Sequence, residues 1–219
     1  IMGRYYAQLD GEAPDVAEAM DELYMPRHAG DVLPMTKIGQ ALAIADKLDT
    51  VVGIFGIGQP PTGSKDPFAL RRSALGLLRI IIECKLAVDL QELLSSSVGL
   101  LKDKLTAKEV DTQVFDFMMD RLRAYYHDVG VSADVFEAVL AERPTQPYDF
   151  DRRVRAVNSF RELPEAESLA AANKRISNIL RQAQEKKIKV PGKIDESKLS
   201  EPAEQALAKA VAELTAKVT

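Results

Sequence analysis

Apolar residues recur every three or four positions along almost the whole chain. In residues 12–24 this spacing is carried by Val16, Met20 and Leu23, and it predicts an amphipathic helix. The same spacing predicts helices over residues 37–52, 90–105, 107–129, 133–142, 149–161, 164–186 and 202–218. The longest alternating stretch, Val51–Ile57, is short, and no internal repeat is present. We therefore predict an all-α fold, a multi-helix bundle.

Two of these patterns place their apolar residues on one side of the helix. Val16 and Met20 lie on the apolar stripe of the first helix. Ile38, Leu42 and Val51 lie on the stripe of the second.

Glycine, proline and capping residues separate the helices. A loop is expected over Gly53–Gly63. The next helix is expected to begin with Asp66 as its cap and Pro67 in the first turn, where the missing N–H of proline costs nothing. Apolar residues on several faces of that helix predict a central, buried position. Ser132 is expected to cap the 133–142 helix, and Val190–Gly192 is expected to be a turn or a linker.

The composition fits helix-on-helix packing. The chain has 219 residues, of which 46% are hydrophobic but only 6% aromatic, and it has no Trp. Its single cysteine, Cys84, excludes an intrachain disulfide and is typical of a reducing compartment. We expect this thiol to be buried and unreactive. No apolar run is long enough to span a bilayer, so we expect a cytoplasmic protein with no membrane partner. Ile1 in place of an initiator Met leads us to expect a piece of a longer chain.

Charge is distributed unevenly. Residues 152–193 contain eleven Lys or Arg and four Glu, a net charge of +7, whereas the rest of the chain carries −11. A basic segment in an acidic protein is typical of a contact with a phosphate backbone. The alternative is a solvated helix face, which is a common reason for such a run.

One segment nearly matches a phosphate-binding loop. Residues 58–65 read Gly-Gln-Pro-Pro-Thr-Gly-Ser-Lys, so the final Ser64 and Lys65 stand in the reverse of the order that the motif requires. Two adjacent prolines also remove backbone N–H donors that would hold phosphate. We interpret this segment as a connecting loop with Lys65 exposed.

A metal-dependent phosphohydrolase of the HD type is a second possibility. His28 with Asp46 and Asp49 would supply part of its ligand set. The dipeptide His127-Asp128, however, follows the Asp segment instead of preceding it. A metal site needs a complete set of converging ligands, so we interpret Asp46 and Asp49 as surface carboxylates.

Several long motifs resemble bacterial glycyl-tRNA synthetase beta subunits. In order along the chain they are Met2–Ala7, Tyr24–Arg27, Asp46–Gly58, Pro61–Arg72, Ala133–Leu140 and Ala171–Leu180. The resemblance covers nearly the whole chain in collinear order.

This resemblance implies a role and a partner. The family's enzyme contains two alpha and two beta subunits, and its alpha subunit activates glycine with ATP and Mg²⁺. The beta subunit binds and positions tRNA-Gly. By this resemblance the present chain has no catalytic residue, metal ligand or cofactor of its own. Residues 1–105 look like the later part of a degenerate HD-like helical domain. Residues 106–219 look like the beginning of an anticodon-binding domain related to that of arginyl-tRNA synthetase.

The candidate tRNA-binding residues combine the resemblance with the basic segment. They are Arg152, Arg153, Arg155, Asn173, Lys174, Arg175, Asn178 and Arg181. We expect the cations to neutralise phosphates and the two asparagines to read base edges. Arg175 is equally compatible with a structural ion pair. Arg71 and Arg72 stand near a helix start, where a cation gains nothing from the helix dipole, so a carboxylate or RNA must hold them.

Three functions therefore compete. The first is a tRNA-binding part of the beta subunit. The second is an HD-type metal phosphohydrolase with its metal near His28 and Asp46. The third is a structural helical scaffold that contacts the alpha subunit without binding RNA.

Overall fold

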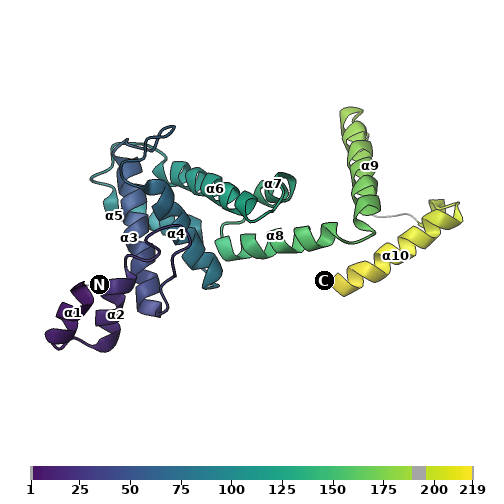
Figure 1. Cartoon of the computed structure of the whole chain (residues 1–219). Coiled ribbons are helices and arrows are strands. Elements are labelled where there is room, and N and C mark those ends of the chain that lie inside the picture. The colour runs from purple at the N-terminus through teal and green to yellow at the C-terminus, as the bar shows by residue number, and fades with distance from the viewer. Residues whose placement is uncertain (1, 189–195, 219) are drawn as a thin grey trace. The chain divides into compact units, whose positions relative to one another are not determined.

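The computed structural model describes residues 2–188 and 196–218, and within them the chain is all-α (Figure 1). The helices are α1 (Met2–Leu9), α2 (Pro14–Glu22), α3 (Lys37–Gly56), α4 (Leu70–Glu83), α5 (Leu90–Leu101), α6 (Val110–Asp128), α7 (Ala133–Ala141), α8 (Pro147–Arg161), α9 (Ala166–Glu185), η1 (Glu196–Lys198, a 3-10 turn) and α10 (Pro202–Val218). The predicted fold class is confirmed. The turn expected over Val190–Gly192 lies outside the described residues.

The chain divides into two compact units. The first comprises Ile1–Glu162 and the second Leu163–Thr219. Helices before and after residue 105 pack on one another in the first unit, where α3, α4 and α5 all contact α6. The boundary expected between residues 105 and 106 would separate the HD-like domain from the anticodon-binding-like domain, and it stays a prediction.

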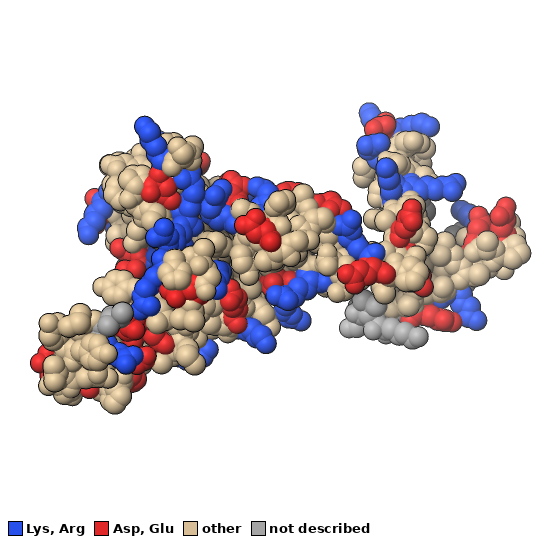
Figure 2. Space-filling view, viewed as in Figure 1, with Lys and Arg blue, Asp and Glu red and all other residues tan. Residues whose placement is uncertain are grey.

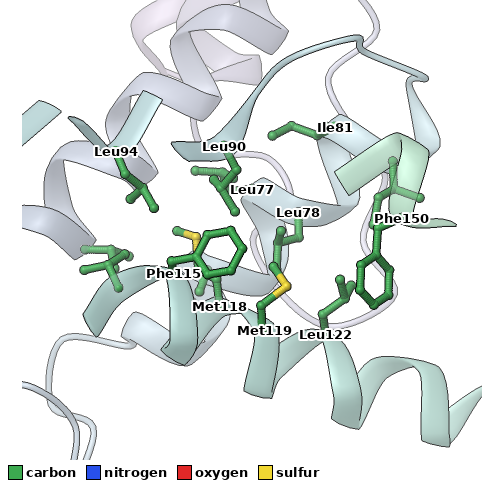
Figure 3. Packing of buried hydrophobic residues seen from close by; sticks show 14 of the residues in the cluster. Leu77, Leu78, Ile81, Leu90, Leu94, Phe115, Met118, Met119, Leu122 and Phe150 are labelled. Carbon is green, nitrogen blue, oxygen red and sulfur yellow. The ribbon is translucent and has the colours of Figure 1, made fainter. Parts of the chain in front are cut away.

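The core of the first unit lies between α3, α4, α5 and α6 and extends to α7 and α8. Figure 3 shows side chains from α4, α5, α6 and α8 meeting there. Ten of them are labelled: Leu77, Leu78, Ile81, Leu90, Leu94, Phe115, Met118, Met119, Leu122 and Phe150. The buried position predicted for the 66–81 region is confirmed, since Leu77, Leu78 and Ile81 have no exposed surface.

Side-chain caps fix where two of the core helices begin. The Thr36 hydroxyl accepts a hydrogen bond from the Gly39 N–H, 3.0 Å away, at the start of α3. Asp89 accepts bonds from the N–H groups of Gln91 and Glu92, at 2.9 and 3.1 Å, at the start of α5. These bonds satisfy N–H groups that have no partner inside the helix.

The start predicted for α4 is wrong by three residues. The helix begins at Leu70 instead of Pro67, because Ala69 takes a left-handed conformation with φ of 53°. Asp66 nevertheless accepts hydrogen bonds from the N–H groups of Leu70 and Arg71, at 2.8 and 3.0 Å. Ser132 stands at the N-cap of α7 as predicted, but its side chain makes no capping bond.

The two predicted apolar stripes are only partly buried. Val16 and Met20 are exposed, as are Ile38 and Leu42 in the first half of α3. The residues buried in these parts of the two helices are small or polar, Ala17, Ala19 and Glu22 of α2 and Gly39, Gln40 and Ala43 of α3. Val51, further along α3, is buried.

Several helix limits also differ from the predicted ones. The hydrophobic pattern did not predict α1, which pairs with α2. α3 continues to Gly56, so the loop expected from Gly53 begins four residues later.

The described residues of the second unit form two amphipathic α-helices, α9 and α10, and the 3-10 turn η1. Among the described side chains of this unit only Ala166 is buried. Across the described residues, we find no helix whose length and apolarity would suffice for a membrane span.

Candidate nucleic-acid interface

Three of the candidate tRNA-binding residues lie on α8. This helix belongs to the first unit and is anchored in its core by Phe150 and Val154, which are both buried. Arg152, Arg153 and Arg155 are exposed to solvent. One face of α8 is therefore packed against the core, and its arginines point to solvent.

Arg155 is already part of a structural network. Its Nε donates a hydrogen bond to Asp151, 2.7 Å away, and Asp151 is itself buried. The other oxygen of Asp151 accepts a hydrogen bond of 2.8 Å from the hydroxyl of buried Tyr126. The hydrogen bond with Asp151 raises the pKa of Arg155 above its usual range. Arg155 thus balances a buried carboxylate, in addition to any contact with RNA.

Arg153 also has an acidic partner within α8, whereas Arg152 has none among the described residues. Arg153 donates to Asp149 one helical turn earlier, over 2.7 Å. Both side chains of that pair are substantially exposed, so the pair is weak. Within the described part of the chain, Arg152 makes no hydrogen bond or ion pair. Of the three arginines, Arg152 is the one that would meet a phosphate without giving up an existing partner.

The other five candidates lie on α9, in the second unit. Lys174, Asn178 and Arg181 follow one another at helical spacing, so they share one face of the helix. Arg181 donates to the side-chain oxygen of Asn178 over 3.3 Å. Glu167 and Glu185 stand on the same face toward the two ends of the helix. The cations on this face of α9 therefore lie between two acidic residues, and Figure 2 shows Lys and Arg side chains along this helix.

The opposite face of α9 is apolar and uncovered. Leu169, Ile176 and Ile179 are all more than half exposed. Asn173 and Arg175 lie at the two borders between this apolar stripe and the polar face. No acidic group among the described residues pairs with Arg175, so the alternative of a structural ion pair has no support there.

The near phosphate-binding loop forms a tight turn of its own. The N–H of Thr62 donates to the carbonyl of Lys65 over 3.1 Å, and the N–H of Lys65 donates to the carbonyl of Thr62 over 2.8 Å. Gly63 has a φ of 49° within this turn, and Lys65 is exposed. Two backbone donors that would hold a phosphate are thus used by the turn, which confirms the interpretation as a connecting loop.

The candidate metal ligands do not gather at one point, and the thiol of Cys84 is partly buried. Asp46 and Asp49 are exposed on α3, which confirms that they are surface carboxylates. Across residues 2–188 and 196–218, no three His, Cys, Asp or Glu side chains gather around a point that could hold a metal ion. Cys84 is half-buried, and burial raises the pKa of its thiol, which lowers its reactivity.

Arg71 and Arg72 belong to a feature that the sequence did not predict. Arg71 donates to the carbonyl of Gly63 over 2.7 Å and lies 3.9 Å from Asp66, so a carboxylate does stand beside it. Together with Arg79 and Arg121, these arginines line a cavity of about 660 Å³ in the first unit. Because Arg121 comes from α6, some fifty residues beyond Arg71, no local pattern groups these four side chains.

The fold and its exposed cations define an all-α protein with basic helix faces, a class that includes modules contacting nucleic-acid phosphates. Residues 1–141 match the family model of the glycyl-tRNA synthetase beta subunit, and the chain belongs to that family. It is 58% identical to the glycine–tRNA ligase beta subunit of Pseudoalteromonas translucida over 97% of the chain. It is 56% identical to the beta subunits of Haemophilus influenzae and Pseudomonas aeruginosa over its full length. The chain spans about a third of the length of these relatives, 30 to 31%.

Proposed function

We propose that this chain is a tRNA-handling part of a glycine–tRNA ligase beta subunit. In this role it binds tRNA-Gly and holds it in position while glycine is attached. The relatives named above are beta subunits of that ligase, which supports the assignment. The proposed setting is the cytoplasm, where tRNA is charged for translation.

Catalysis is assigned to a separate polypeptide in this proposal. A beta subunit implies an alpha subunit, and we propose an assembly of two copies of each. The alpha subunit would activate glycine with ATP and Mg²⁺, and the present chain would contribute binding energy and orientation. Holding a substrate in the reactive geometry accelerates the reaction without a chemical group from this chain.

The observation that carries the proposal is the two-sided character of α9. Its cationic face and its apolar stripe lie on opposite sides of the helix. An apolar stripe is stabilised when protein covers it, whereas the cationic face gains most from phosphates. A helix built this way is suited to lie between a protein core and an RNA backbone.

The proposal assigns different roles to the eight candidates. Lys174, Arg175 and Arg181 would neutralise phosphates, and Arg152 would do so on α8. The side-chain amides of Asn173 and Asn178 would donate hydrogen bonds to base edges and accept hydrogen bonds from them. Arg153 and Arg155 would add positive charge near the RNA while they remain paired within α8.

A filter-binding titration with tRNA-Gly tests this function. Charge reversal at Arg175 or Arg152 is expected to weaken binding about tenfold or more, because a lost contact is joined by repulsion from phosphate. The matched control is reversal of Arg143, an exposed arginine 3.6 Å from Asp116 and outside the proposed interface. Equal affinity for the wild type and the two test variants would refute these sites.

A second candidate function is a scaffold that contacts the alpha subunit. It is favoured by the exposed apolar side chains of α1 and α2, among them Tyr5, Tyr6 and Met20. In that case an immobilised chain would retain the alpha subunit, and Met20→Glu would abolish the retention. Retention of the alpha subunit without any affinity for tRNA-Gly would support the scaffold over the tRNA-binding function.

A further inference from the structure

The first unit contains a cavity with an excess of positive charge. It has a volume of about 660 Å³ and lies between α4, α6 and the loop that joins α2 to α3. Its charged lining consists of Arg71, Arg72, Arg79, Arg121, Glu83 and Asp128, beside the imidazole of His28. Four guanidinium groups thus face two carboxylates. Such an excess of cations in one hollow attracts anions.

Two of these arginines have partners. Arg79 donates to Glu83 over 2.7 Å and approaches the carbonyl of Asp31 at 3.4 Å. Arg71 donates to the carbonyl of Gly63 and lies 3.9 Å from the carboxylate of Asp66. Their positions on α4 are therefore fixed before a ligand arrives, which reduces the entropy lost on binding.

The other two arginines have no such partner. Within the described residues neither Arg72 nor Arg121 makes a hydrogen bond or an ion pair. The Nε of Arg121 is buried and has no hydrogen-bond partner in this part of the chain. Leaving a buried donor of a charged group unpaired is unfavourable, so native proteins seldom do so without a reason. Its guanidinium lies 5.8 Å from the ring of Phe117, which limits its movement.

We propose that this cavity binds a phosphate-bearing nucleotide unit. A guanidinium presents its donors in a planar fork that matches two phosphate oxygens, and two unpaired arginines at one hollow supply two such forks. The cavity is large enough for a sugar and a base beside the phosphate. Leu75, Tyr125 and Val129 also line it and offer the apolar surface that a base requires.

The nucleotide has two possible sources, a free nucleotide or one residue of a bound RNA. In the second case the inference rests on the proposed function, and the cavity is an RNA contact on the first unit, separate from α9. In the first case it is independent of that function. The phosphate chemistry is the same in both.

The test uses two variants and a matched control. Arg72→Gln removes an exposed, unpaired charge and leaves the core untouched. Arg121→Gln removes the second unpaired guanidinium, and its circular dichroism must match that of the wild type. Arg143→Gln is the control, because Arg143 is exposed on the same unit and lies outside the cavity. Each protein is titrated with AMP by calorimetry and with tRNA-Gly by filter binding.

Saturable AMP binding that weakens about tenfold in Arg72→Gln and Arg121→Gln, but not in Arg143→Gln, supports a free-nucleotide site. Failure of AMP to bind, with tRNA-Gly binding weakened about fivefold or more by the same two variants, supports an RNA contact. If tRNA-Gly binds the wild type and both variants equally and AMP does not bind, the inference is overturned and the proposed function stands. If AMP binds as predicted while tRNA-Gly does not bind at all, the inference stands and the proposed function fails. Binding of neither probe to the wild type overturns both.

Discussion

The substitution Tyr126→Phe tests the network that joins α8 to α6 within the first unit. The Tyr126 hydroxyl donates a 2.8 Å hydrogen bond to Asp151, and both residues are buried. The ring lies 5.9 Å from that of Phe136 and 6.0 Å from that of Phe150, measured between centroids. Phenylalanine keeps these ring contacts and removes only the hydrogen bond. A hydrogen bond to a charged acceptor contributes about 1.5–3 kcal/mol, and we expect the free energy of unfolding to fall by that amount.

The pH dependence of this loss provides a second readout. Burial, followed by the hydrogen bond to Asp151, raises the pKa of Tyr126 far above its ordinary value of 10.0. The unfolded tyrosine therefore loses its proton near pH 10, whereas the folded one keeps it. Because the folded state then binds more protons, the stabilisation by Tyr126 is complete below that pH and declines above it. The slope is about 1.4 kcal/mol per pH unit for one group.

Urea unfolding followed by far-ultraviolet circular dichroism measures both effects. The advantage of the wild type over Tyr126→Phe should be full at neutral pH and should shrink as the pH rises above about 10. Tyr6→Phe is the control, since Tyr6 is 59% exposed and its loss should change the free energy of unfolding by about 0.5 kcal/mol or less. Equal stability of Tyr126→Phe and the wild type, at neutral and at alkaline pH, would refute the role given to this network.

Two further substitutions test the helix starts. Asp89→Ala removes the cap of α5 and the acceptor of the Thr145 hydroxyl, and we expect urea unfolding to show a loss of about 1–2 kcal/mol; an unchanged midpoint would contradict the capping role. Gly39→Ala places a methyl group against the Glu22 carboxylate, which accepts hydrogen bonds from the residues that precede α3. We expect a loss of about 1–3 kcal/mol from overpacking, measured in the same way, and a variant as stable as the wild type would show that Glu22 moves aside freely.

The hydrophobic spacing was sufficient to predict most of the helices, because a helix that packs on one side carries an apolar residue every three or four positions. It did not predict which stripes stay exposed. Val16 and Ile38 have the spacing of core residues, yet solvent reaches both. The capping signal of Asp66 and Pro67 placed the start of α4 three residues too early, because the left-handed conformation of Ala69 leaves no trace in a pattern of residue types.

The candidate site was predictable only as a set of exposed cations. Local charge identifies Lys174 and Arg181, which are exposed on α9. It does not show that Arg155 is paired and Arg152 is not. Arg155 is bonded to Asp151, which is buried and accepts a hydrogen bond from Tyr126 of another helix. It also cannot group Arg72 with Arg121, which only the packing of α4 on α6 brings to one cavity.

The salt dependence of tRNA-Gly binding tests the central claim most directly. Each phosphate contact that is removed should lower the slope of log Kd against log salt concentration by about one, so replacing Lys174, Arg175 and Arg181 together by Gln should lower it by about two to three. Binding should also weaken most at low salt. A triple variant with the same slope and affinity as the wild type would show that the cationic face of α9 does not meet RNA.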